Sequence, residues 1–201
     1  MKKYTELIVN ITVMLCATIM IAILPTDKDA AIYEDTLRLH ILASSDSDED
    51  QGLKYEIRDK LLKKYGEQLK SASSIKEAEN EVSELIDNIE RDVNIWIEEA
   101  GYSYGCAVAI GTEWYGTREY ENFTLPKGYY TSLCIKLGEA EGQNWWCVMY
   151  PPLCLDIATE SSPADDFIPG YSNEEYTLIT KDGYNIKFKM LELISSAFSK
   201  K

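Results

Sequence analysis

Residues 36–57 read TLRLHILASSDSDEDQGLKYEI, and within this stretch a hydrophobic period of two changes to a helical period. Leu37, Leu39 and Ile41 alternate with other residues, which is the pattern of a half-buried β-strand. The serines and aspartates that follow stop the strand, cap a helix and place acidic groups in its first turn. The stretch therefore predicts a strand followed directly by a helix.

Two long helices are predicted after this strand. Residues 53–65 carry an apolar residue at every fourth position, and Gly66 is expected to end the first helix. The second helix is predicted to begin at a capping box formed by Ser74 and Glu77 and to end near Gly101. Its expected apolar face consists of Ala78, Val82, Leu85, Ile86, Ile89, Val93 and Trp96.

The hydrophobic period returns to two after the helices. Alternating apolar residues predict a strand over 102–110, and residues 131–150 are interpreted as a hairpin. In WWCVMY (145–150) both alternating sets are apolar, so this strand is predicted to lie in the middle of the sheet, covered on each face. Pro151 and Pro152 then stop it, because proline cannot donate to a strand ladder.

The C-terminal part completes the predicted architecture. Residues 156–175 are interpreted as a long acidic loop, residues 176–188 as a hairpin that turns at Asp182-Gly183, and the last residues as a C-terminal helix. The whole pattern predicts one α+β domain over residues 31–201, with a mainly antiparallel sheet, two long helices after the first strand and a C-terminal helix.

An apolar segment precedes this domain. Residues 7–24 are uncharged and mainly apolar, and as a helix they would span about 27 Å, close to the thickness of a bilayer's hydrocarbon core. Lys2 and Lys3 come before the segment, so the positive-inside bias places the rest of the chain outside the membrane. Residues 1–30 are therefore a signal peptide or an N-terminal membrane anchor. A retained anchor is favoured, because the positions before a cut near residue 30 are charged rather than small.

The charge of the domain excludes one class of partner. The chain has a net charge of −14, and the charges within residues 1–30 cancel, so the whole excess lies in the exported part. Such an acidic domain is repelled by phosphate backbones, and nucleic-acid binding is not expected.

Export changes how the cysteines are interpreted. Cys16 lies in the apolar segment, which leaves Cys106, Cys134, Cys147 and Cys154 outside, and four cysteines allow three pairings. A structural disulfide between Cys147 and Cys154 is expected across the proline turn, and two buried thiols are the alternative. Within the tryptophan-rich block, residues 144–154, the residues expected to be structural are Trp145, Trp146, Cys147, Pro151, Pro152 and Cys154.

Catalytic chemistry has little support in the residue pattern. A cysteine hydrolase would need Cys147 or Cys154 to be activated by His40, the single histidine. A cell-envelope hydrolase based on two carboxylates has no motif that marks its acids among the many in the domain. We therefore expect that the protein is not an enzyme, uses no cofactor and has no small-molecule substrate. The alternative function is that of an exported cell-envelope hydrolase.

Metal binding is not expected from residue spacing. Neither CxxC nor HxxxH occurs, and these short spacings are typical of zinc sites. Asp46, Asp48 and Asp50 resemble the start of a calcium-binding loop, but Gln51 and Ile57 stand where that loop needs Gly and Glu. Helix capping explains these aspartates better.

Two stretches resemble the stage II sporulation protein R family of endospore-forming bacteria. LRLHILASSDSDEDQGLKYEIRD (37–59) is similar to the family signature R-x-H-x-x-A-N-S-D-S-x-x-D-Q-x-x-K-x-x-V-R-D. GQNWWCVMYPPLC (142–154) is similar to G-x-N-W-W-C-V-x-[FY]-P-P-L-C. The resemblance includes the predicted core of the domain, residues 36–155, whereas residues 156–201 lie outside both signatures.

The resemblance implies a role in intercellular signalling. A member of this family is made in the forespore and exported into the space between the two sporulation membranes, either secreted or anchored by its N-terminus. There it is expected to activate a membrane-embedded aspartic protease, which then processes the precursor of sigma-E. The polar residues of the first signature are the expected partner-binding residues: Arg38, His40, Asp46, Asp50, Lys54, Arg58 and Asp59.

Overall fold

The computed structural model describes residues 2–22, 27–120, 123–153 and 170–180. The helices are α1 (Lys2–Ala22), α2 (Asp27–Glu34), α3 (Asp48–Lys70), α4 (Ile75–Glu99) and α5 (Asn173–Thr180). The strands are β1 (Leu37–Leu42), β2 (Cys106–Tyr115), β3 (Arg118–Glu119), β4 (Thr124–Leu125), β5 (Gly128–Leu137) and β6 (Asn144–Tyr150). The described chain therefore has the α+β composition that the sequence predicts.

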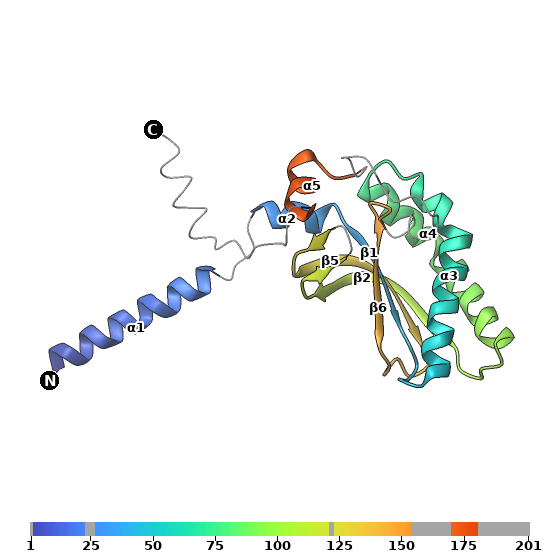
Figure 1. The fold of residues 1–201 in the computed structure, drawn as a ribbon, viewed down its shortest axis with the longest axis horizontal. Helices are drawn as coiled ribbons and strands as arrows, with labels where there is room; N and C mark the ends of the chain where they lie inside the picture. The colour runs from blue at the N-terminus through green and yellow to red at the C-terminus, as the bar shows by residue number, and fades with distance from the viewer. Residues whose placement is uncertain (1, 23–26, 121–122, 154–169, 181–201) are drawn as a thin grey trace.

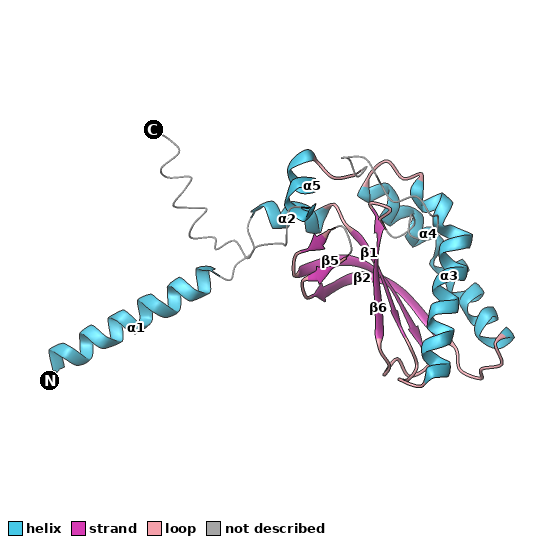
Figure 2. Cartoon of the chain, viewed as in Figure 1, coloured by secondary structure: helices cyan, strands magenta, loops and turns pink. Residues whose placement is uncertain are grey.

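Four strands form a sheet in the order β2-β5-β1-β6, and β3 pairs with β4 in a small separate ribbon. The β2–β5 and β1–β6 pairs are antiparallel and the β1–β5 pair is parallel, so the sheet is mainly antiparallel, as predicted. Helices α3 and α4 both pack against one face of the sheet (Figures 1 and 2). We call this the inner face and the opposite one the outer face.

The hydrophobic core lies between the inner face and the two long helices. Leu37, Leu39 and Ile41 of β1 are fully buried, which confirms the alternation predicted for this strand. Ile57 and Leu61 of α3 are equally inaccessible and belong to the same core. Each such side chain contributes about 1.5–3 kcal/mol when it leaves water, so β1 is held mainly by its inner-face residues.

Serine residues begin both long helices. The Ser47 side chain accepts a hydrogen bond from the Asp50 main-chain N–H, and Ser74 does the same for Glu77. α4 ends at Glu99, and Gly101 has a φ of 87°, a left-handed conformation that favours glycine. The predicted caps and the predicted end of the second helix are confirmed.

The predicted end of the first helix is wrong, because α3 continues through Gly66 to Lys70. Tyr65, the residue before the glycine, is buried and donates its hydroxyl hydrogen to the Asp92 carboxylate on α4. Glycine within a helix costs about 1 kcal/mol relative to alanine. The packing of this turn against α4 outweighs that cost.

The hairpin predicted over residues 131–150 is also wrong. β1 lies between β5 and β6 and pairs with both, so the two later strands are not neighbours. β6 is consequently an edge strand and not the middle strand that its two apolar faces suggested. Both of its faces are nonetheless covered, because Cys147 lies in the core while the Arg118 guanidinium covers the Trp146 ring at 3.5 Å.

Two further boundaries differ from prediction. The strand expected from residue 102 begins at Cys106, because the hydroxyls of Tyr102 and Tyr104 are bonded to the start of α3. Residues 176–180 lie in α5 rather than in a strand, since Ser172 and Glu175 form a capping box that the sequence reading missed. The acidic loop over 156–169, the turn at Asp182-Gly183 and the C-terminal helix lie outside the described residues.

The predicted membrane segment is helical, since α1 spans Lys2–Ala22. Within the described part of the chain, however, no helix combines the length and the apolar character required to cross a bilayer. The membrane-spanning role of this segment stays a prediction.

Candidate functional site

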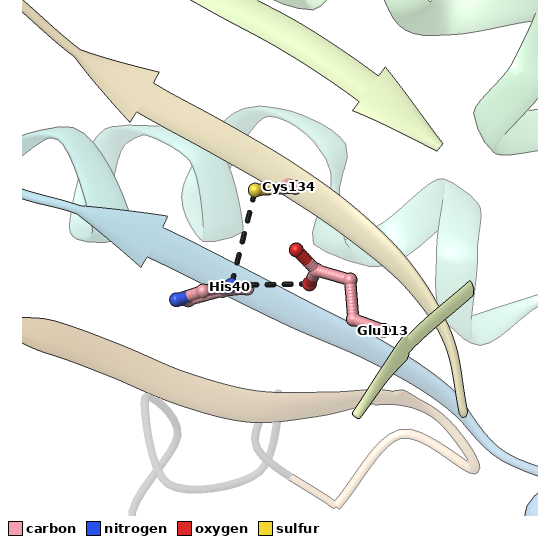
Figure 3. Close-up of side chains that lie close together, drawn as sticks. All are labelled: His40, Glu113 and Cys134. Atoms are coloured by element: carbon pink, nitrogen blue, oxygen red, sulfur yellow. Dashed lines mark hydrogen bonds and ion pairs between the residues drawn. The ribbon is translucent and has the colours of Figure 1, made fainter. Parts of the chain in front are cut away.

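The outer face carries a cluster of three chemically different side chains. His40 lies on β1, Cys134 on the neighbouring β5 and Glu113 on β2 (Figure 3). His40 Nδ1 lies 3.0 Å from Glu113 Oε2 and 3.8 Å from Cys134 Sγ. Alternation along the strands places all three on the outer face, because Leu39 and Ile41 next to His40 lie in the core.

Two neighbours hold the imidazole ring of His40 in place. Its other nitrogen, Nε2, lies 2.7 Å from Asn144 Oδ1 at the start of β6. The ring also stacks on Trp146, with ring centroids 5.6 Å apart. His40 is therefore oriented by contacts on both sides, with Nδ1 directed at Glu113 and Cys134.

The electrostatics of the cluster favour a carboxylate next to a protonated thiol. Burial by itself would raise the pKa of Glu113, but the hydrogen bond and charge of His40 outweigh it and lower that pKa. The pKa of Cys134 is raised to about 12 by burial and then by the Glu113 charge. A thiol with such a pKa is a weak nucleophile at neutral pH, so the cluster is poorly suited to covalent catalysis by Cys134.

A small cavity opens beside the cluster. It has a volume of about 240 Å³ and lies over β2 and β5, with Glu113, Ser132 and Cys134 in its wall. Ala107, Ala109 and Gly111 line the β2 side, and their small size leaves the space above the sheet open. Two members of the cluster are therefore accessible to a small ligand or to water.

Arg38, also on the outer face, is enclosed by aromatic rings. Its guanidinium lies 4.0 Å from the Tyr115 ring centroid and 5.0 Å from that of Tyr130, and Nη2 donates to the Tyr120 hydroxyl at 2.6 Å. The residue is fully buried, and its Nε and Nη1 atoms have no hydrogen-bond partner among the described residues. Arg38 is therefore enclosed within the fold near the start of β1 and does not extend to the surface.

Comparison with known proteins places the chain in a family. A model of the family "Stage II sporulation protein R (spore_II_R)" matches residues 33–160. The chain belongs to the stage II sporulation protein R family. It is similar to "Stage II sporulation protein R" of Bacillus subtilis (strain 168), with 30% identity over 192 residues and 86% of each chain covered. No solved structure gives a significant match.

Several signature residues have structural roles in this fold. The Asp50 carboxylate accepts hydrogen bonds from Ser45 Oγ and from the Tyr104 hydroxyl, at 2.5 and 2.6 Å. These bonds, Ser45 first, lower the pKa of Asp50 against the opposing effect of burial. Lys54 is almost fully buried. Its ammonium group donates a hydrogen bond to the Gln143 carbonyl at 3.0 Å, which connects α3 to the loop before β6.

The other signature residues lie nearer the surface. Asp46 and Asp59 are exposed, and Arg58 is half-buried. The Arg58 guanidinium forms an ion pair with Asp59 at 2.7 Å and lies 5.2 Å from the Trp145 ring centroid. The structure thus separates the seven expected partner-binding residues: Arg38, Asp50 and Lys54 are buried, these three are accessible, and His40 is half-buried in the outer-face cluster. Partner binding by the set stays a prediction.

Five of the six residues expected to be structural lie within the described part of the chain. Trp145 and Trp146 are half-buried, Cys147 is buried, and Pro151 follows a cis peptide bond. Pro152 is half-buried, and Cys154 lies outside the described residues. Cys106 and Cys134 are free thiols. The disulfide expected between Cys147 and Cys154 stays a prediction.

Sequence reasoning found His40 but missed Glu113, Cys134 and Asn144 as its neighbours. These three residues are separated from it by 73, 94 and 104 positions, and no short motif connects them. Period-two alternation could have assigned Cys134 to the outer face of its strand. It could not have supplied the strand order that brings the four residues together.

Proposed function

We propose that this chain is an exported sporulation signal that activates a membrane-embedded aspartic protease, and that this protease then processes the sigma-E precursor. The observation that supports this proposal is membership of the stage II sporulation protein R family across residues 33–160. The apolar segment at residues 7–24, with lysines before it, provides the route of export. The chain acts in the space between the two sporulation membranes.

Activation is a shift of population in the partner. A protease that exists in idle and competent states becomes active when a ligand binds the competent state more tightly. The accessible residues of the first signature, Asp46, Arg58 and Asp59, are the part of that signature that a partner can contact directly. The buried residues Arg38, Asp50 and Lys54 contribute by holding this surface in shape.

A cysteine hydrolase is the rival function, and the geometry weighs against the form that uses Cys147, whereas Cys154 lies outside the described residues. Cys147 belongs to the core side of β6, whereas His40 lies on the outer face, so His40 cannot act as its base. Cys134 does lie beside His40, but the Glu113 carboxylate next to it opposes the thiolate that such an enzyme requires.

The proposal is tested by co-expressing the full chain with the candidate protease and the sigma-E precursor in a host that does not sporulate. Cleavage of the precursor is followed by immunoblot. We expect cleavage only when all three proteins are present, and no cleavage when the catalytic aspartate of the protease is replaced. An uncut precursor in cells that accumulate all three intact proteins would refute the proposed function.

A second assay tests whether the chain is a hydrolase. The purified full chain in detergent is incubated with peptidoglycan, and release of soluble fragments is measured. The signalling function predicts no release above that of a heat-denatured sample. Release that disappears in a folded Cys134→Ala variant would establish the hydrolase instead.

A further inference from the structure

Three potential metal ligands converge on the outer face, and they supply three different donor atoms. His40 offers Nδ1, Glu113 a carboxylate oxygen and Cys134 a sulfur, and these atoms all lie within 4.8 Å of one another. We propose that His40, Glu113 and Cys134 bind a divalent transition-metal ion, and that zinc is the ion their geometry fits best. The proposal goes beyond protease activation and does not depend on it.

The separations between the donor atoms fit a tetrahedral ion. With zinc bonds of about 2.3 Å to sulfur and about 2.0–2.1 Å to nitrogen and oxygen, tetrahedral angles place N and S about 3.6 Å apart and N and O about 3.3 Å apart. The observed distances from His40 Nδ1 are 3.8 Å to Cys134 Sγ and 3.0 Å to Glu113 Oε2. These two pairs therefore need shifts of a few tenths of an ångström, and the third separation, from the Glu113 carboxylate to Cys134 Sγ, is within 4.8 Å.

The surroundings of His40 resemble those of a metal-bound histidine. Metal-binding histidines usually donate their second ring N–H to an oxygen, which fixes the tautomer and the ring orientation. Asn144 Oδ1, 2.7 Å from Nε2, provides that acceptor and leaves Nδ1 as the nitrogen for the metal. Stacking on Trp146 further restrains the ring.

The donor set selects the class of metal. Calcium and magnesium prefer oxygen ligands, whereas imidazole and thiolate together suit zinc and its neighbours in the first transition row. Binding releases the proton of the Cys134 thiol and the Nδ1 proton that His40 directs at Glu113, so that the metal takes a thiolate and the Nδ1 lone pair of a neutral imidazole. The cation also removes the repulsion between the resulting thiolate and the Glu113 carboxylate.

The fourth coordination position is accessible. Glu113 and Cys134 both line the 240 Å³ cavity, so a water molecule or a donor from another molecule can complete the site. Zinc sites with three protein ligands and one exchangeable ligand are typical of catalytic or regulatory sites, whereas structural sites have four protein ligands. The bound ion would join β1, β5 and β2 through their side chains.

Cobalt substitution tests the site through its absorption spectrum. The full chain, purified in detergent and carrying Cys16→Ala to remove the thiol of α1, is freed of metal with a chelator and kept reduced. Co²⁺ is then titrated in. We expect a thiolate-to-cobalt charge-transfer band and the intense visible bands of tetrahedral Co²⁺, saturating at one ion per chain and displaced by Zn²⁺.

Matched variants assign the ligands. Cys134→Ala should abolish the charge-transfer band, whereas Cys106→Ala should retain it. The free thiol of Cys106 lies on the other face of the same sheet, where it contacts the Glu90 carbonyl of α4. Glu113→Gln, which preserves size, should weaken binding at least tenfold. Asn144→Ala, which removes the acceptor behind His40, should weaken it about 10–100-fold. Circular dichroism checks that each variant is folded.

Thermal unfolding gives an independent readout. A metal that binds only the folded state raises its melting temperature. Zn²⁺ should therefore raise the melting temperature of the metal-free protein and of Cys106→Ala but not that of Cys134→Ala. Absence of the charge-transfer band, its persistence in folded Cys134→Ala, or an equal zinc effect on both cysteine variants would overturn the proposal.

Discussion

His40 and Cys147 lie on adjacent strands but on opposite faces of the sheet. In the β1–β6 pairing, Cys147 is opposite Leu39 and His40 is opposite Trp146. Cys147 is 1% exposed and belongs to the core with Leu39, whereas His40 faces the outer-face cluster. Cys147 is consequently a structural residue of the hydrophobic core.

The predicted disulfide is tested by a double-mutant cycle on Cys147 and Cys154. Removing a native disulfide typically costs about 2–5 kcal/mol. We expect Cys147→Ala and Cys154→Ala each to lower the free energy of unfolding by such an amount under oxidising conditions. The double variant should lose no more than about the larger single loss, because both changes delete the same bond. Denaturant unfolding measures all four proteins, and strictly additive losses would show that the two cysteines are not bonded.

Arg38 is predicted to act in folding rather than in recognition. Replacing a buried charge with an apolar side chain of similar length is often neutral or stabilising, and two of its nitrogens lack partners among the described residues. We expect Arg38→Met to lower the free energy of unfolding by no more than about 1 kcal/mol. Arg38→Ala should cost about 2–4 kcal/mol, because it leaves a cavity among the tyrosines. If Arg38→Met folds normally but fails to activate precursor cleavage, Arg38 has a recognition role.

Asp50 is expected to make the fold sensitive to acid. Its hydrogen bonds with Ser45 and Tyr104 lower its folded-state pKa, so its contribution is fully present above the unfolded value of about 3.9 and disappears as pH falls through the folded value. We expect Asp50→Asn to cost about 1–3 kcal/mol at pH 7 and less at pH 3. The free energy of unfolding, measured with urea at both pH values, checks this difference.

Asp48→Asn is the matched control, because Asp48 is exposed in the same first turn of α3. It should cost less than about 1 kcal/mol at pH 7, the usual size of a charge–dipole effect at a helix N-terminus. An Asp50→Asn loss as large at pH 3 as at pH 7 would contradict the assignment.

Arg58 is the accessible cation of the first signature and is expected to contact the partner. Arginine is common among residues whose loss costs an interface 2 kcal/mol or more, and each 1.4 kcal/mol is about tenfold in affinity. We expect Arg58→Glu to reduce precursor cleavage at least tenfold while changing the free energy of unfolding by no more than about 1 kcal/mol. Lys63→Glu, an equal charge change at an exposed position of α3, should leave cleavage unchanged. Equal losses from both variants would indicate a general effect of charge.

Local sequence was sufficient for the elements whose signals lie within a few residues. The alternation of Leu37, Leu39 and Ile41 predicted β1. The run of serines and aspartates at 44–50 and the capping box at Ser74 predicted where both long helices begin. These predictions succeed because side-chain direction and cap bonding depend on nearest neighbours along the chain. The same reasoning failed at Gly66, where the contact of Tyr65 with Asp92 on another helix outweighs local propensity.

Only the tertiary structure decided which strands are neighbours. The chain order suggested that β5 and β6 pair, yet β1 lies between them, parallel to one and antiparallel to the other. This arrangement brings Cys134 and Asn144 to opposite sides of His40, and the register of the β1–β6 pair places Cys147 opposite Leu39 on the other face. Strand order depends on contacts between residues far apart in the chain, and hydrophobic periodicity specifies a strand's faces without specifying its neighbours.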